Sequence, residues 1–432
     1  MKNPRAETYI RQFSDYSSAA RMNTYVCGLD VWLTRKFLHA IGNPALQVVL
    51  WNGEKVVSSS PAPPVTMTLR NRSVLWRLLT NPLLHFGDDY SAGLIEVEGG
   101  LVSFLETVYR SMAVSRKYQK APDPAAYRRN QPKLNSRTGS QQNIHHHYDI
   151  GNDFYRLWLD SEMLYTCAYF PENCLTLEEA QTAKMELVCR KLRLQKGQTV
   201  VEAGCGWGGL ARYMARRYGV KVKAYNISSE QIAYARQRAR TEGLESQIDY
   251  VHDDYRNITG SYDAFASVGM LEHVGPDHYR ELGAVINRSL KDHGLGLIHS
   301  IGQNLATPMS PWFLKRIFPG SYPPTLREMM TVFEPWEFSV LDVENLRLHY
   351  AKTCGQWLAR FDRSQDKILE MYDEKFVRAW RLYLSGCIAN FNLGALQLFQ
   401  VVFSRSANNS IPLNRKHLAA IDGNALWKAA TR

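Results

Sequence analysis

The strongest constraint in this sequence is an alternation of strand-like and helix-like segments that begins at Gln198. The expected strands are Thr199–Glu202, Val220–Tyr225, Ile248–His252, Ala264–Ser267 and Leu295–Ser300. The expected helices between them are Gly208–Tyr218, Ser229–Glu242 and His278–Leu290. Such alternation predicts an α/β fold, with a parallel sheet covered by helices on both faces. Ligands of these sheets bind at the carboxyl ends of the strands.

A glycine-rich loop follows the first of these strands. Glycine lets the backbone turn sharply and approach a ligand closely. Gly204, Gly206 and Gly209 fit the dinucleotide pattern G-x-G-x-x-G. A nicotinamide enzyme would carry an acid about 20 residues further on, whereas the second strand ends in Tyr225-Asn226. The loop also fits E-x-G-x-G-x-G, which is typical of S-adenosylmethionine-dependent methyltransferases, and we favour this interpretation over a dehydrogenase.

Further sequence strings narrow this interpretation, and they cover about residues 143 to 403. They are His146–Tyr155, Tyr165–Phe170, Thr176–Gln181, Asp254–Arg256, Ser267–Gly275, Ile317–Gly320 and His349–Thr353. Their order and spacing resemble the cyclopropane fatty acid synthase family, which includes the mycolic acid cyclopropane synthases. The resemblance implies a Rossmann-like methyltransferase fold. It also implies transfer of one carbon from S-adenosylmethionine to the cis double bond of an unsaturated phospholipid acyl chain.

The resemblance also implies roles for residues at matching positions. Those that would contact S-adenosylmethionine are Tyr165, Thr166, Gly204, Gly206, Trp207, Asn226, Gln231, Asp254 and Tyr255. Those that would hold a bicarbonate ion are Glu272, His299, Tyr350 and, through their backbones, Cys167 and Ile301. Asn226 stands where threonine is commoner in the family.

The implied chemistry explains why an anion is needed. Alkylation of an alkene leaves a carbocation, which must be kept from water while a proton is removed from the added methyl group. Tyr350 and His299 can donate to the oxygens of bicarbonate, whereas an ionised Glu272 can only accept its O–H. We therefore take as a hypothesis that Glu272 orients the bicarbonate. The three consecutive histidines from His145 lack a nearby cysteine, so we expect no metal site.

The sequence of residues 1–118 predicts a smaller α+β domain at the N-terminus. Asn52-Gly53 lies between two strand-like runs and predicts a hairpin with a type I′ turn. A strand is expected at 65–69, and helices at 73–79 and 101–109. Extended members of the family carry a domain here that resembles sterol-carrier-type lipid-binding modules, and the run Phe86–Gly99 fits that group. A basic linker at 119–142 and the methyltransferase domain at 143–432 complete the expected organisation.

Charge and composition limit the partners. The formal net charge of +11 favours anionic partners. Because the chain carries no recognisable nucleic-acid-binding module, we expect no nucleic acid but an anionic phospholipid membrane surface. The most apolar run, from Cys387 to Phe403, is interrupted by asparagine and glutamine. We therefore expect a cytoplasmic protein bound peripherally to the inner face of the membrane. A homodimer is one option for its assembly.

Three other functions remain open. The same alkene could lose its proton elsewhere, which would give a methylene- or methyl-branched chain. A small-molecule N-methyltransferase would share the fold but would need no lipid-binding domain. A lipid carrier could keep the fold without catalysis, although this chain retains the glycines together with Glu272, His299 and Tyr350.

Overall fold

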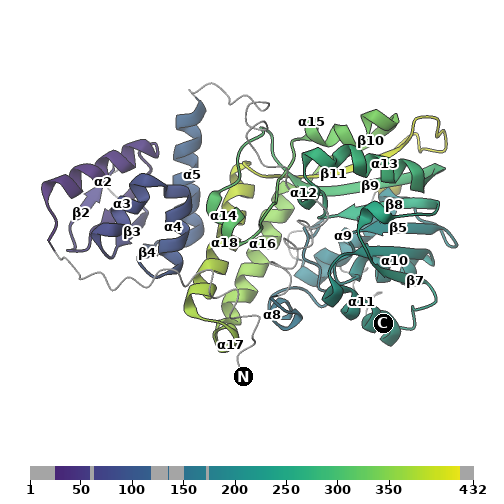
Figure 1. Cartoon of the computed structure of the whole chain (residues 1–432), viewed down its shortest axis with the longest axis horizontal. Coiled ribbons are helices and arrows are strands. Elements are labelled where there is room, and N and C mark those ends of the chain that lie inside the picture. The colour runs from purple at the N-terminus through teal and green to yellow at the C-terminus, as the bar shows by residue number, and fades with distance from the viewer. Residues whose placement is uncertain (1–24, 59–62, 118–134, 136–149, 172–174, 419–432) are drawn as a thin grey trace. The chain divides into compact units, whose positions relative to one another are not determined.

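The computed structural model (Figure 1) describes residues 25–58, 63–117, 135, 150–171 and 175–418. These residues form two compact units. The first unit joins the N-terminal residues to 307–319 and 354–395, and the second contains 135–306, 320–353 and the residues from 396 on. The expected domain boundaries, at 118/119 and 142/143, lie outside the described residues and stay a prediction.

The first unit contains a four-stranded sheet of order β2-β1-β3-β4. Its strands are β1 (Leu46–Val49), β2 (Lys55–Val57), β3 (Val65–Leu69) and β4 (Ile95–Glu98). Helices α2 (Gly28–Ala40), α3 (Arg72–Thr80), α4 (Pro82–Ser91) and α5 (Leu101–Lys117) accompany them. In β3 the side chains of Val65, Met67 and Leu69 are buried because alternate residues of a strand point to the same face. The N-terminal residues thus form an α+β arrangement with a buried sheet face, and helices from later in the chain belong to the same unit.

The β1–β2 hairpin forms where it was predicted, but its turn type was wrong. Gly53 has a φ of 91°, whereas Asn52 is not in the left-handed region that a type I′ turn requires of both residues. The N–H of Gly53 donates to Leu50 O, and the N–H of Leu50 donates to Glu54 O. This is a three-residue loop that ends in one left-handed glycine. The Asn52 side chain accepts from the N–H of Glu54 and so stabilises the loop.

Helices from the C-terminal half complete the first unit. They are α14 (Pro311–Arg316), α17 (Gln365–Met371) and α18 (Glu374–Leu393), together with the end of α16 (Arg347–Arg363). Helix α18 packs on α4 and α5, and the Arg378 guanidinium lies 4.4 Å from the centre of the Tyr90 ring. Gly87 is required in α4, because a Cβ there would lie 2.5 Å from the Trp312 ring. Within the described residues, no helix combines the length and the apolar character needed to cross a membrane.

The second unit contains a seven-stranded sheet of order β10-β11-β9-β8-β5-β6-β7 (Figure 1). Its strands are β5 (Thr199–Ala203), β6 (Lys221–Asn226), β7 (Ile248–His252), β8 (Tyr262–Val268), β9 (Leu290–Gly302), β10 (Phe338–Asn345) and β11 (Gln397–Arg405). Strands β5 to β9 pair in parallel, as the sequence predicted, while β11 pairs antiparallel with β9 and β10. The α/β fold class is confirmed.

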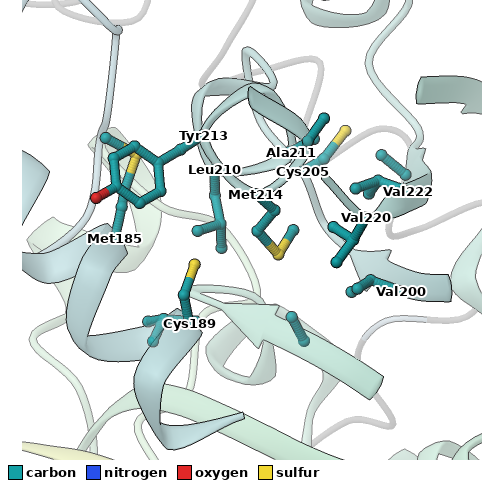
Figure 2. Packing of buried hydrophobic residues seen from close by; sticks show 14 of the residues in the cluster. Met185, Cys189, Val200, Cys205, Leu210, Ala211, Tyr213, Met214, Val220 and Val222 are labelled. Carbon is teal, nitrogen blue, oxygen red and sulfur yellow. The ribbon is translucent and has the colours of Figure 1, made fainter. Parts of the chain in front are cut away.

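Helices cover both faces of this sheet. They are α9 (Leu177–Lys191), α10 (Gly209–Tyr218), α11 (Ser229–Thr241), α12 (Leu271–Val274), α13 (Tyr279–Ser289) and α15 (Leu326–Met329). The short helix α8 (Asn152–Arg156) belongs to the same unit. Val200 faces a core shared with α9, α10 and α11, part of which Figure 2 shows. Its neighbour Val201 faces a second core, shared with α13. Successive residues of one strand thus pack against helices on opposite faces of the sheet.

A buried ion pair between Asp88 and Arg316 offers a test of the first unit. The two carboxylate oxygens lie 3.0 and 3.2 Å from the guanidinium, and both side chains are nearly inaccessible. Asp88→Ala should lower the free energy of unfolding by about 3–5 kcal/mol, because it removes the carboxylate that neutralises a buried guanidinium. Urea unfolding followed by tryptophan fluorescence measures the change.

The exposed pair of Arg240 and Glu245 provides the matched control. Glu245→Ala should cost less than about 1 kcal/mol, because solvent screens this pair. Equal losses in the two variants would show that the Asp88–Arg316 pair does not stabilise the unit.

Candidate functional site

The glycine loop after β5 needs glycine for its backbone. Gly204, Gly206 and Gly208 have φ values of 82°, 53° and 77°, in the region that other residues rarely adopt. A Cβ at Gly208 would collide with the Tyr250 hydroxyl, whereas a Cβ at Gly206 would meet nothing within 4 Å. The N–H groups of Gly204 and Cys205 both donate to Tyr225 O, in the next-to-last residue of β6. The loop is therefore held to the sheet and leaves open space beside Gly206.

Asn226, the last residue of β6, connects this loop to helix α11. Its Nδ2 lies 3.2 Å from Gly206 O and 2.7 Å from Gln231 Oε1. Its Oδ1 accepts from the N–H of Ser228, which caps the helix. Two of the predicted site residues, Asn226 and Gln231, are thus in direct contact. An asparagine can hold the loop in this way because its amide is both donor and acceptor.

Aromatic rings gather beside the loop. The ring of Tyr155 lies 5.0 Å from Trp207 and 5.4 Å from Tyr165, and Trp158 lies 5.2 Å from Tyr165. The indole N–H of Trp207 donates to Asn152 Oδ1. Sequence reasoning named Tyr165 and Trp207 but assigned no role to Tyr155 or Trp158. Tyr155 ends one of the strings that carried the resemblance, so that string could have indicated it.

Asp254 and Tyr255 follow β7, at the same edge of the sheet. The Asp254 carboxylate accepts from the backbone N–H and the guanidinium of Arg256, both at 2.9 Å. Tyr255 is buried, and burial raises the pKa of its hydroxyl. These two predicted residues are fixed by Arg256 and the adjoining core.

Helix α9 holds the segment that contains Tyr165 and Thr166. Lys184 Nζ donates to Thr166 Oγ1 at 2.9 Å, and Gln181 Nε2 donates to Thr166 O at 2.9 Å. Burial lowers the pKa of Lys184 to about 8, opposed by the nearby carboxylates of Asp160 and Glu202. Sequence reasoning missed Lys184, because a lysine on a helix is ordinarily exposed.

Glu272 lies in α12, directly after β8, and its carboxylate is buried. Its Oε1 accepts from the backbone N–H of Ile301 at 2.6 Å. Its Oε2 has no hydrogen-bond partner among the described residues. Burial raises the pKa of Glu272 to about 7. The structure thus brings Glu272 and Ile301 together, and the N–H of Ile301 is already engaged by the carboxylate.

His299 lies in β9 and is almost completely inaccessible. Its Nδ1 lies 3.1 Å from Gln400 Nε2, and its Nε2 has no hydrogen-bond partner in the part of the chain that the structure describes. Burial lowers its pKa to about 3, and the positive charges of Lys184 and Lys191 act in the same direction. His299 is therefore neutral. Gln400 was not identified from the sequence.

The remaining predicted residues lie on two segments that bond to each other. The N–H of Ala168, next to Cys167, donates to Thr353 Oγ1 at 3.0 Å. The N–H of Phe170 donates to His349 Nδ1 at 3.0 Å. The buried Tyr350 lies between these two positions of α16. Burial raises the pKa of the Cys167 thiol, which makes it a poor nucleophile.

Two buried polar atoms among these residues have hydrogen-bonding capacity that the described part of the chain does not use. The acceptor Glu272 Oε2 and the ring nitrogen Nε2 of His299 are both buried polar atoms without a protein partner in the described structure. Burying such atoms is costly unless something completes their hydrogen bonds. The described residues contain no group of three His, Cys, Asp or Glu side chains that could hold a metal ion. His145–His147 lie outside the described residues.

Comparisons with known proteins cover both parts of the chain. The family model described as mycolic acid cyclopropane synthetase matches residues 135–401, and a model of a domain of unknown function matches residues 33–119. A probable fatty acid methyltransferase of Pseudomonas putida is 35% identical over 83% of this chain and 91% of its own length. The cyclopropane-fatty-acyl-phospholipid synthase of Escherichia coli K12 is 41% identical over 62% of this chain and 69% of its own.

Solved structures agree with this match. The mycolic acid cyclopropane synthase CmaA1, complexed with SAH and CTAB, is 28% identical with a TM-score of 0.59. The match covers 63% of this chain and all of that one. Coclaurine N-methyltransferase, at 21% identity and a TM-score of 0.63, covers 74% of this chain and 99% of its own, and shows the fold alone.

The buried carboxyl of Glu272 should make stability depend on pH. Folded protein keeps a proton on Glu272 up to a pH of about 7, whereas an unperturbed glutamic acid loses it near 4.5. Between these values the folded state binds more protons than the unfolded chain, so this residue lowers the free energy of unfolding as the pH rises. The full shift corresponds to about 3 kcal/mol.

Glu272→Gln removes this titration. The melting temperature of Glu272→Gln minus that of the original protein should therefore be larger at about pH 8 than at about pH 5. The exposed Glu245→Gln should show no such trend. A constant difference between Glu272→Gln and the original protein at both pH values would mean that Glu272 titrates normally.

Proposed function

Because this chain belongs to the mycolic acid cyclopropane synthetase family, we propose that it is a cyclopropane-fatty-acyl-phospholipid synthase. It would use S-adenosylmethionine to add a methylene carbon across the cis double bond of an unsaturated phospholipid acyl chain. The observation that carries the proposal is the pair of unsatisfied polar atoms, Glu272 Oε2 and His299 Nε2, buried at the carboxyl ends of β8 and β9. When bound, S-adenosylmethionine supplies an electrophilic methyl group and bicarbonate supplies a base.

The cradle around Gly206 fits the methyl donor. The open space beside this glycine lets a ligand approach the backbone, and Asn226 and Gln231 keep the loop in place. The aromatic rings beside the loop can stabilise a sulfonium without reacting with it. The residues that would hold the donor are Tyr165, Thr166, Gly204, Gly206, Trp207, Asn226, Gln231, Asp254 and Tyr255.

The pair of Glu272 and His299 fits bicarbonate. When ionised, Glu272 Oε2 can accept the single O–H of that anion, and His299 Nε2 can donate to another of its oxygens. Tyr350 is the second donor that the resemblance implies. By accepting the O–H of bicarbonate, Glu272 would orient the anion so that its other oxygens, which are basic, point toward the substrate. The backbones of Cys167 and Ile301 would lie beside the anion. The Ile301 N–H would contribute indirectly, because it donates to Glu272 Oε1 and so holds the carboxylate in place. Burial of Glu272, His299, Tyr350 and Cys167 would keep water from a cation on the acyl chain.

A second candidate acts on the same alkene. The relative from Pseudomonas putida is named a probable fatty acid methyltransferase, and it matches 83% of this chain. If the cation lost its proton from a carbon of the acyl chain, the product would be a methyl-branched alkene. If a hydride first moved to the cationic carbon and the added methyl group then lost the proton, the product would be a methylene-branched lipid. The product itself separates the two candidates.

The test is to incubate purified protein with S-adenosylmethionine, bicarbonate and vesicles of cis-unsaturated phosphatidylglycerol. Mass spectrometry should show acyl chains with one added CH₂, and NMR should show ring protons and no exocyclic methylene. Glu272→Gln should lower turnover by roughly 100-fold or more, because the carboxylate that is proposed to hold the bicarbonate base is lost. Its dissociation constant for S-adenosylmethionine should change by less than about twofold. Unaltered acyl chains would refute the proposal, and full turnover in Glu272→Gln would refute the role of that residue.

We also propose that the first unit binds the anionic surface of the membrane. On α2, Leu29 and Trp32 are 55% and 52% exposed, one turn apart. The Lys36 ammonium lies 5.5 Å from the Trp32 ring, on the same side of the helix. Exposed tryptophan beside lysine is the combination found where proteins meet lipid headgroups. The proposal includes a peripheral position on the inner face of the membrane, where anionic lipids give a negative surface potential.

Trp32→Ala should weaken binding to vesicles that contain phosphatidylglycerol by roughly tenfold, because about 1.5 kcal/mol of aromatic burial is lost. Co-sedimentation of protein with vesicles measures this. Leu369→Ala, at a partly exposed position on α17, serves as the control and should leave binding unchanged. Unchanged binding of Trp32→Ala would exclude this face of α2.

A further inference from the structure

Gln400 lies opposite His299 in the sheet. The two residues are register partners in the antiparallel pair β9–β11, so their side chains share one face. Gln400 is completely buried, and its Nε2 lies 3.1 Å from His299 Nδ1. Its Oε1 has no hydrogen-bond partner in the described part of the chain, so the contact with His299 is the one that orients this amide.

This contact determines which ring nitrogen carries the proton. His299 is neutral, since it is buried and faces the positive charges of Lys184 and Lys191. A neutral imidazole has one N–H, on either Nδ1 or Nε2. An amide nitrogen can donate but cannot accept, so with Gln400 Nε2 against Nδ1 the contact is a hydrogen bond when Nδ1 is the acceptor and the proton is on Nε2. Nε2 is also the atom that lacks a protein partner.

We infer that Gln400 is a positioning residue that fixes His299 as the Nε2–H tautomer, a permanent donor to the small anion. This inference rests on the proposed function, since it deepens the account of the same site. With Nδ1 occupied and Nε2 protonated, His299 has no free lone pair with which to take a proton. His299 therefore holds the anion, and the anion is the base.

The geometry also explains why glutamine, and not its isostere glutamate, stands at position 400. A carboxylate there could only accept, so it would draw the proton to Nδ1 and leave a lone pair on Nε2. A lone pair facing the oxygens of an anion is repulsive, and the donor to the anion would be lost. Leu and Met at position 400 would leave the tautomer of His299 free to change.

The tautomer can be read without any turnover. In protein labelled with ¹⁵N-histidine, the ring nitrogens of His299 are assigned by their absence in His299→Gln. We expect a protonated Nε2 in the original protein and a protonated Nδ1 in Gln400→Glu. Gln400→Met removes the donor without adding a charge, and it should give a mixture of the two tautomers. It also keeps the test decisive if a buried glutamate prevents folding.

Kinetics provide the second readout. In Gln400→Met, the KM for bicarbonate should rise by roughly tenfold or more, because part of the population lacks the donor to a charged group. The KM for S-adenosylmethionine should stay within about twofold, whereas a general loss of structure would change both. A protonated Nδ1 in the original protein, or an unchanged bicarbonate KM in Gln400→Met, would overturn the inference. If the original protein leaves lipids unaltered, the proposed function fails, while the NMR result still decides whether Gln400 sets the tautomer.

Discussion

The structure depends on the burial of polar side chains at the carboxyl ends of β8 and β9. Desolvation holds His299 neutral and makes the charge of Glu272 costly at neutral pH. The same desolvation would let a carbocation on an acyl chain survive long enough to lose its proton. A site open to water would have ordinary pKa values and would hydrate the cation. The chemical proposal therefore rests on packing as much as on the identity of the side chains.

The sheet is the scaffold that makes this burial possible. Parallel pairing of β5, β6, β7 and β8 brings their carboxyl ends to one edge, where the glycine loop and Asn226 form the cradle. Antiparallel β11 then covers the other side of β9 and brings Gln400 against His299. The proposed donor cradle and the proposed anion site thus lie at the same edge of the sheet. Lys184 of α9 holds Thr166, one of the predicted cofactor residues, by a hydrogen bond.

Much of this fold could be predicted from the sequence, because strand and helix periods are local. The expected strands from Thr199 to Ser300 all form, and so does the hairpin at Asn52-Gly53. The type I′ turn was wrong because several turns accept Asn-Gly and the loop length decides between them. Strand β11 was not separated from the apolar run that starts at Cys387. In the structure that run is divided by Gly394, with a φ of 74°, at the end of α18.

The residues of the candidate site also divide into those that could be predicted from the sequence and those that could not. Residues within characteristic strings, such as Gly204, Glu272 and Tyr350, could be named from their neighbours in sequence. Lys184 and Gln400 could not, because their roles come from partners that are distant in the chain. The register of β9 against β11 places Gln400 opposite His299, across 101 residues of sequence. The predicted set of site residues stays a prediction, and the structure adds the contacts that give it a physical basis.

The central claim is that a small anion completes the hydrogen bonds of Glu272 and His299. A crystal structure of the protein with S-adenosylhomocysteine and bicarbonate at neutral pH tests it most directly. The account predicts planar density for a three-oxygen anion, with oxygens about 2.6–3.2 Å from Glu272 Oε2 and His299 Nε2. Well-ordered density that shows only water there, or a direct hydrogen bond between the two side chains, would contradict it.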